Sequence, residues 1–400
     1  MTITQTRPLV AASSVRGAVL VALVLTALNL RTAVTGFAVL TDAAGRTLDF
    51  GPVVAGAIGS IVTGCFAAAA FAAPGVVRRL GLERTAAVAL LATTAGIVLR
   101  AVAWSPAALL VASAVAFLGV GASNVILIPI VREHFPDRVR SISLLYLVLL
   151  QVGQLVAPLM SLPLAHALGW RTAAGAWAVL TGAGAALWVV VAVRTRAVER
   201  TAAEPVAAEP GWWRTPVVLG LIGLMSMTTL HTYTLVTWFP TMLRDAGTSA
   251  TTGALMLSWF AGLGLVGAFA VPALAARLRS TFPIALACTV LMAVGYLGML
   301  AAPAAGAVVW ALAFGLGVST FPLCLVLIAS TAQDARRAGR LSGLVQGVGY
   351  GVGCLGPLTL GALNQLTGGW DAAYLLLLAT LVITAVSGWF ASRGSLESGG

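Results

Sequence analysis

Long apolar runs dominate this sequence and restrict what the chain can fold into. A helix needs about 20 apolar residues to cross the hydrocarbon core of a bilayer. Twelve such runs occur, near residues 16–40, 51–73, 84–103, 106–131, 142–165, 171–193, 216–240, 250–275, 281–301, 306–330, 342–366 and 371–392. They are too long for membrane-spanning strands and do not alternate, so they predict an all-α membrane protein with twelve transmembrane helices.

The composition excludes several classes of protein. Hydrophobic residues make up 60% of the chain and charged residues 9%, whereas soluble domains carry about 25% charged residues. A soluble enzyme and a disordered protein are therefore excluded. The net charge of +11 lies in short loops rather than on one face, so we expect no nucleic-acid partner.

The distribution of arginine predicts the orientation in the membrane. If the N-terminus is cytoplasmic, eighteen arginines fall in cytoplasmic segments and four fall in external loops. The external four are Arg46, Arg100, Arg171 and Arg244. Because positive charge favours the cytoplasmic side, we expect a multi-pass protein of the plasma membrane with both termini in the cytoplasm.

The chain is expected to consist of two halves. A polar segment at 194–215 separates a six-helix bundle at 1–193 from a second at 216–400. Gly119–Asn124 and Ala157-Pro158 have counterparts in the second half, in Gly315–Thr320 and Gly356-Pro357. Such parallel repeats place a substrate site between the halves, near the bilayer midplane. The alternative is that alanine-rich helices resemble one another by composition alone.

Polar residues within the spans are the candidates for function. No acidic residue lies in the middle of a span, whereas Arg31 lies about 15 residues, or roughly 22 Å, beyond Arg16. A buried arginine without an acid suits an anionic substrate. Alternatively, Arg31 extends to the outer interface. His231 lies at the equivalent position of the second half and either binds an anion or carries a proton, or it is a structural residue.

Neutral polar groups from both halves complete the expected cavity. Asn124, Gln151, Gln346 and Tyr350 would line it, with Trp238 on the same helix face as His231. For each amide alone, hydrogen bonding between helices is the competing explanation. For Trp238, the alternative is a place in the outer aromatic belt of the membrane.

Motifs for catalysis and for cofactors are missing from the sequence. The four cysteines lie in apolar runs without CxxC spacing, which predicts free thiols rather than a metal cluster. Two GxGxxG matches lie inside spans, where they are packing surfaces. We expect no enzyme activity, cofactor or metal.

The loop pattern resembles the major facilitator superfamily. Basic loops follow the second, fourth, eighth and tenth spans, and Gly81 with its neighbouring arginines matches the loop between the second and third spans. The family's aspartate in that loop is replaced here by Arg78. The resemblance implies gating roles for cytoplasmic loop arginines, namely Arg78, Arg79, Arg277 and Arg279.

A finer resemblance is to the cyanate permease and nitroimidazole transporter family. It rests on Asn29–Ala33, Gly121–Arg138, Thr237–Pro240, Leu341–Tyr350 and Gly368–Trp370. The resemblance implies a transporter of the bacterial inner membrane that carries a small anion or a nitroimidazole-like solute, and we expect it to be a monomer. The expected substrate-binding residues are Asn29, Arg31, Asn124, Gln151, His231, Trp238, Gln346 and Tyr350.

The sequence therefore predicts a secondary transporter that works by alternating access. Protons are a candidate coupling ion, carried by His231 or by the substrate. Multidrug efflux on the same fold is the main alternative, and it predicts that loss of Arg31 is tolerated. A membrane-embedded enzyme and a sensor on a transporter fold are further alternatives.

Overall fold

The computed structural model describes residues 9–195, 211–331 and 335–397, and within these ranges the chain is helical with no strand. This confirms the predicted all-α fold. The predicted linker at 194–215 lies largely outside the described residues. So do the N-terminal eight residues and Arg196 and Arg200.

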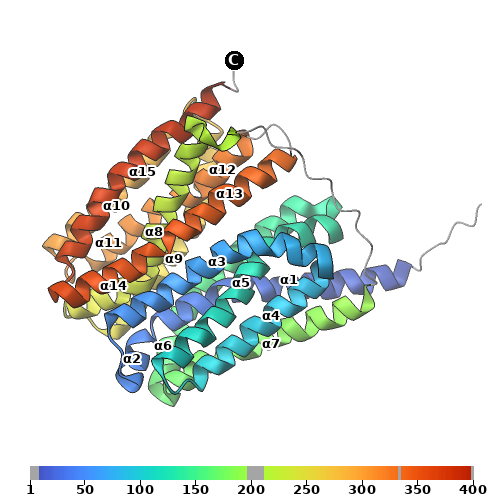
Figure 1. The fold of residues 1–400 in the computed structure, drawn as a ribbon, viewed down its shortest axis with the longest axis horizontal. Coiled ribbons are helices and arrows are strands. Elements are labelled where there is room, and N and C mark those ends of the chain that lie inside the picture. The colour runs from blue at the N-terminus through green and yellow to red at the C-terminus, as the bar shows by residue number, and fades with distance from the viewer. Residues whose placement is uncertain (1–8, 196–210, 332–334, 398–400) are drawn as a thin grey trace, which may run out of the picture.

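The helices form two bundles (Figure 1). The first contains α1 (Leu9–Ala38), α2 (Thr41–Leu48), α3 (Pro52–Leu80), α4 (Leu82–Ala101), α5 (Pro106–His134), η1 (Pro136–Arg138), α6 (Val139–Leu168) and α7 (Trp170–Arg194). The second contains η2 (Trp212–Arg214), α8 (Pro216–Asp245), α9 (Ala250–Ala275), α10 (Phe282–Ala301), α11 (Ala307–Gly317), α12 (Thr320–Thr331), α13 (Ala335–Gly353), α14 (Leu355–Thr367) and α15 (Asp371–Glu397).

Eleven segments of the described chain are long and apolar enough to cross a membrane, and α11 with α12 forms one of them. The remaining predicted span, at 342–366, is covered by α13 and α14. The twelve expected crossings are therefore all present as helix.

Local sequence signals explain where the helices begin and turn. Ser105 accepts a hydrogen bond from the Ala108 amide at 3.2 Å, and proline follows it at the first helical position of α5. The side chains of Thr215 and Ser249 likewise cap α8 and α9, and proline follows the cap in α8 as well. Gly81 has φ of 84° between α3 and α4, a conformation that glycine adopts without steric cost.

Proline explains the two interrupted spans. Pro322 has no N–H for the Val318 carbonyl, which accepts from the Phe321 amide at 3.0 Å instead, so α11 and α12 are separate. Pro357 lies in the first turn of α14, directly after the break at Cys354. Glycines on both sides of this break lower the cost of bending.

The two bundles meet where α3 packs on α13 and α14, α6 packs on α9, and α1 and α3 pack on α8. A Cβ atom on Gly56 would lie 2.5 Å from the Pro357 carbonyl oxygen, and one on Gly59 would collide with Thr237. Small residues thus permit close approach of the helices.

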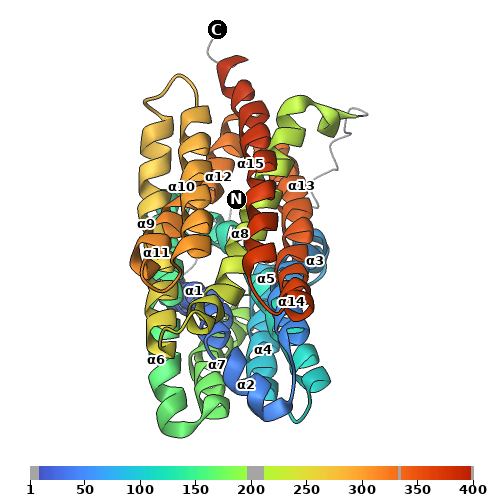
Figure 2. The same cartoon turned by 90° about the vertical axis from the view of Figure 1, so that its left-hand side faces the viewer.

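The two ends of the molecule differ in how the bundles meet. We call the end that carries α2 the α2 end, and the opposite end, which carries Arg194 and Pro216, the linker end. The bundles lie side by side near α2 and α14, and their linker ends point in different directions (Figure 1). In Figure 2, α2 lies at the opposite end of the molecule from the last turn of α15 (Asp371–Glu397).

Candidate functional site

Arg31 lies where the two bundles meet and binds across the interface. Its Nη1 donates to the Tyr233 hydroxyl oxygen at 2.9 Å, which joins α1 to α8. The Tyr233 ring meets Phe66 of α3 and Tyr350 of α13 edge to face, with centroid separations of 6.1 and 6.2 Å. The ring centroids of Phe66 and Tyr350 are 5.4 Å apart. We call Arg31, Phe66, Tyr233 and Tyr350 the interface site.

The positive charge of Arg31 has no carboxylate partner among the described residues. Its Nε is buried and makes no hydrogen bond. The described ion pairs all lie near helix ends. An arginine at the centre of a membrane helix costs about 2.5–3.5 kcal/mol on insertion scales. The interface site therefore presents an uncompensated cation.

A mainly apolar pocket lies beside the interface site. Phe37, Phe117 and Val236 line it together with Tyr233 and Thr237. Because the lining comes from α1, α2, α3 and α5 of the first bundle and from α8 of the second, the pocket lies between the bundles. Its wall is hydrophobic apart from a few hydroxyl groups, including those of Tyr233 and Thr237.

The predicted polar residues of the first bundle have different environments. Asn29 is buried and donates to the Leu25 carbonyl oxygen of its own helix at 2.8 Å. Gln151 donates to the Ala261 carbonyl oxygen of α9 at 3.2 Å and so links the bundles. Asn124 is partly exposed and makes no hydrogen bond to the described residues.

Tyr350 is the predicted residue of the second bundle that belongs to the interface site. Gln346 donates to the Ser342 hydroxyl of its own helix at 2.6 Å. Trp238 is buried, donates to the Pro357 carbonyl oxygen at 2.9 Å and packs on Trp370 with ring centroids 5.1 Å apart. The geometry thus gives Trp238 a packing role between α8 and α14.

His231 does not meet Arg31. It is 3% exposed, and its Nδ1 lies 2.8 Å from the Tyr296 hydroxyl and its Nε2 3.3 Å from the Thr380 hydroxyl. Both nitrogens therefore have partners inside the second bundle. Tyr233, two positions further along α8, lies opposite Arg31 instead. Sequence reasoning missed Tyr233 because a lone tyrosine in an apolar helix is also typical of packing.

Polar contacts join the bundles at the α2 end. Asp42 of α2 forms an ion pair with Arg244 of α8 and accepts from the Thr241 hydroxyl at 3.4 Å. Asp245 also pairs with Arg244, at 3.3 Å, and accepts from the Trp370 indole at 3.0 Å. The backbone N–H of Leu358 in α14 donates to Ser60 of α3 at 3.1 Å. The contacts of Asp42 and Ser60 join the two bundles at the α2 end, whereas those of Asp245 lie within the second bundle.

The four arginines expected to act in gating lie at the linker end. Arg78, Arg79, Arg277 and Arg279 are exposed. None of them makes a hydrogen bond or an ion pair within the described part of the chain. Their gating role stays a prediction.

The structure contradicts the expected position of Arg100. The arginine distribution assigns it to an external loop, but it lies in the last turn of α4 and is 2% exposed. It is one of the largest fully buried side chains described. The sequence does not reveal that Arg100 is buried, because an arginine near the end of the run 84–103 is also typical of a residue at the membrane interface.

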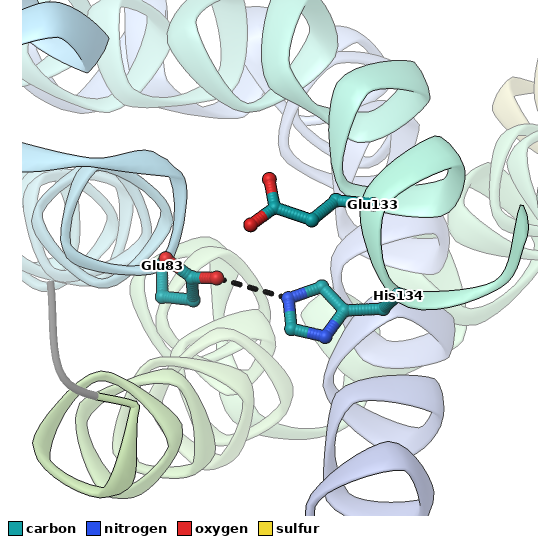
Figure 3. Close-up of side chains that lie close together, drawn as sticks. All are labelled: Glu83, Glu133 and His134. Atoms are coloured by element: carbon teal, nitrogen blue, oxygen red, sulfur yellow. Dashed lines mark hydrogen bonds and ion pairs between the residues drawn. The ribbon is translucent and has the colours of Figure 1, made fainter. Parts of the chain in front are cut away.

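Glu83, Glu133 and His134 gather at the linker end of the first bundle (Figure 3). Their ligand atoms lie within 4.8 Å of one another, and His134 Nε2 is 2.9 Å from Glu83 Oε1. Sequence spacing does not reveal this group because the two glutamates belong to different helices. Glu83 lies in the first turn of α4, where a carboxylate complements the helix dipole, and His134 is the last residue of α5. The arrangement is thus explained as a brace between helices.

Comparison with known proteins identifies relatives along nearly the whole chain. The family model of the Major Facilitator Superfamily matches residues 19–357. The "Uncharacterized transporter YycB" of Bacillus subtilis (strain 168) is 27% identical over 374 residues, which cover 92% of this chain and 91% of that protein. The "2-nitroimidazole transporter" of Escherichia coli (strain K12) is 28% identical, with 92% and 93% covered. The "Cyanate transport protein CynX" of the same organism is 26% identical, with 91% and 96% covered.

Solved structures show the same fold. The nucleoside transporter NupG superposes with a TM-score of 0.71 at 13% identity, covering 94% of this chain and 98% of that one. A bacterial homologue of the human lysosomal transporter Spinster, in an inward-facing and unoccupied conformation, gives 0.71 at 14% identity, with 98% and 99% covered.

Proposed function

The chain belongs to the major facilitator superfamily, and from that premise we propose that it transports a small anion by alternating access through the interface site. The observation that carries the proposal is the bond from Arg31 to Tyr233 across the bundle interface. It puts an uncompensated cation where a substrate must contact both bundles.

The chemistry of the site favours an anion. Arg31 has a buried Nε without a partner, and a substrate oxygen or nitrogen with negative charge would satisfy it. Two relatives carry cyanate and 2-nitroimidazole in their names. Both solutes are small, which suits a site enclosed by Phe66 and two tyrosines.

Each residue of the site has a distinct proposed role. Arg31 binds the negative end of the substrate, and Tyr233 and Tyr350 donate hydroxyl hydrogen bonds from the second bundle. Gln151 and Asn124 are proposed to supply neutral polar groups to the substrate. Because substrate would bind Arg31 in place of Tyr233, it would change the free energy of contact between the bundles.

The proposed orientation in the membrane follows from the arginine distribution. We place the linker end, with both termini, in the cytoplasm of a bacterial cell and the α2 end outside. The contacts of Asp42 and Arg244 then close the external side. Coupling to protons and the monomeric state stay predictions.

Counterflow in proteoliposomes tests the proposal, with labelled cyanate and 2-nitroimidazole as probes. Arg31→Ala should weaken apparent affinity for the anion by at least about tenfold, since hydrogen bonds to charged groups contribute about 1.5–3 kcal/mol. Arg84→Ala, which changes an exposed arginine of α4, is the matched control. Normal affinity in Arg31→Ala would refute the site.

Efflux of lipophilic compounds is the second candidate function. The apolar lining of the pocket beside Tyr233, with Phe37, Phe117 and Val236, favours it. It predicts exchange of lipophilic compounds that is indifferent to Arg31→Ala. Exchange of cyanate that depends on Arg31 would instead exclude it.

A further inference from the structure

Arg100 is a second buried cation of the first bundle, and it contacts the helix that carries Arg31. Its Nε donates to the Ser113 hydroxyl of α5 at 3.0 Å, and its Nη1 donates to the Ala33 carbonyl oxygen of α1 at 2.9 Å. The guanidinium lies over the rings of Phe37 and Phe117, 4.8 and 4.2 Å from their centroids.

These contacts leave Arg100 without an anionic partner among the described residues. Its Nη2 is buried without a hydrogen-bond partner, and the groups that it contacts are a hydroxyl, a carbonyl and two rings. A neutral donor would also satisfy the hydroxyl and the carbonyl, although with weaker hydrogen bonds than a charged group makes. Hydrogen bonding alone therefore does not explain why the residue is charged.

Arg100 acts on the turn of α1 that carries Arg31. Ala33 follows Arg31 by two positions, or about 200° around the helix. Arg31 therefore faces α8 while the opposite side of the same turn is held by Arg100. The two rings that stack on Arg100 also line the pocket beside Tyr233, so the charge lies directly behind the wall of that pocket.

We infer that Arg100 is a positioning residue of the anion site: it fixes the Arg31 turn of α1 and adds a positive charge that strengthens anion binding. This inference rests on the proposed function. The charge acts through low-dielectric protein, where electrostatic interactions extend further than in water. Substrate itself touches Arg31 and not Arg100.

Counterflow of labelled cyanate tests the inference through the KM and the maximal rate. Arg100→Gln should raise the KM by about five- to tenfold, in the range found for residues without ligand contact, with little change in the maximal rate. Arg100→Lys should restore most of the affinity because it keeps the charge. Equal KM values for the glutamine, lysine and wild-type proteins would overturn the inference.

A second pair of variants keeps the test decisive if Arg100→Gln fails to fold. Ser113→Asp places a carboxylate beside the Arg100 guanidinium and neutralises its field, whereas Ser113→Asn is the uncharged control of similar shape. The aspartate variant should raise the KM and the asparagine variant should not. Equal KM values in the two would overturn the inference.

Arg31→Gln is measured in parallel to separate the two proposals. Unchanged affinity in Arg31→Gln would refute the proposed function itself. Lost affinity in Arg31→Gln, with wild-type KM in all Arg100 and Ser113 variants, would refute only the role of Arg100.

Discussion

The hydrogen bond between Arg31 and Tyr233 is the contact on which the proposed function depends at the scale of single residues. The hydroxyl oxygen of Tyr233 accepts this bond from the guanidinium of Arg31 at 2.9 Å. Such a partner orients the guanidinium without neutralising it, in contrast to a carboxylate. The arrangement leaves Arg31 available for an anion.

Removal of the hydroxyl tests this orientation. Tyr233→Phe keeps the edge-to-face ring contacts but loses the hydroxyl that orients Arg31 and donates to the substrate. The KM for the anion should therefore rise by about two- to tenfold, as expected for one hydrogen bond of about 0.5–1.5 kcal/mol. Counterflow kinetics give the value. Tyr146→Phe, at a buried tyrosine of α6, is the control and should keep the wild-type KM. A wild-type KM in Tyr233→Phe, as in Tyr146→Phe, would contradict the role assigned to Tyr233.

His231 is expected to act on stability rather than on substrate affinity. Its hydrogen bonds to Tyr296 and Thr380 lie inside the second bundle, and loss of a buried hydrogen-bond partner costs about 1–3 kcal/mol. His231→Ala should therefore lower the melting temperature of the purified protein and leave the KM unchanged. Tyr296→Phe should have the same kind of effect. A higher KM in His231→Ala at unchanged melting temperature would contradict this expectation and indicate that His231 contributes to substrate binding.

At the scale of helices, the glycine face of α3 permits the bundles to close. Gly56 and Gly59 lie against Pro357 and Thr237, whereas a Cβ atom on Gly64 of the same helix would meet nothing within 4 Å. The sequence predicted the helix but not this difference between its glycines. Which glycine is in contact depends on the partner helix, and α14 lies in the other half of the chain.

Gly59→Leu should therefore prevent the closed arrangement. The new side chain collides with Thr237, so the α2 end should open and transport should stop, while Gly64→Leu should transport normally. The measurement is labelling of a cysteine introduced at Thr41 by a membrane-impermeant thiol reagent, in a background without native cysteines. Faster labelling is expected in Gly59→Leu. Slow labelling and normal transport would show that this contact does not control closure.

At the scale of the whole molecule, the two bundles are closed at one end and splayed at the other (Figure 1). Asp42 and Arg244 provide an ion pair between the bundles at the closed end. Alternating access requires this contact to break when the α2 end opens. The partly exposed position of both side chains suits a contact that is made and broken repeatedly.

Exchange of the two charges tests this contact. Asp42→Arg and Arg244→Asp should each shift the population toward an open α2 end, and the double variant should restore the wild-type population. The coupling is expected to be about 0.2–1 kcal/mol, as for other exposed ion pairs. Spin-label distances across the α2 end provide the populations. If the two single substitutions shifted the population additively in the double variant, direct pairing of Asp42 with Arg244 would be contradicted.

The sequence predicted the fold and two residues of the interface site, Arg31 and Tyr350, for physical reasons. Apolar runs and arginine in short loops are local signals, and Arg31 is conspicuous because the surrounding span is apolar. Tyr233, the burial of Arg100 and the separation of His231 from Arg31 depend on packing between distant helices. The internal repeat pointed to His231, but one helix turn holds both His231 and Tyr233, and only Tyr233 faces the interface.

Equilibrium binding is the most direct test of the central claim, that Arg31 binds an anion between the bundles. Purified wild-type protein, Arg31→Gln and Arg84→Ala would be titrated with labelled cyanate in detergent. The expected result is saturable binding that is lost in Arg31→Gln and retained in Arg84→Ala. Binding of equal affinity in Arg31→Gln would contradict it.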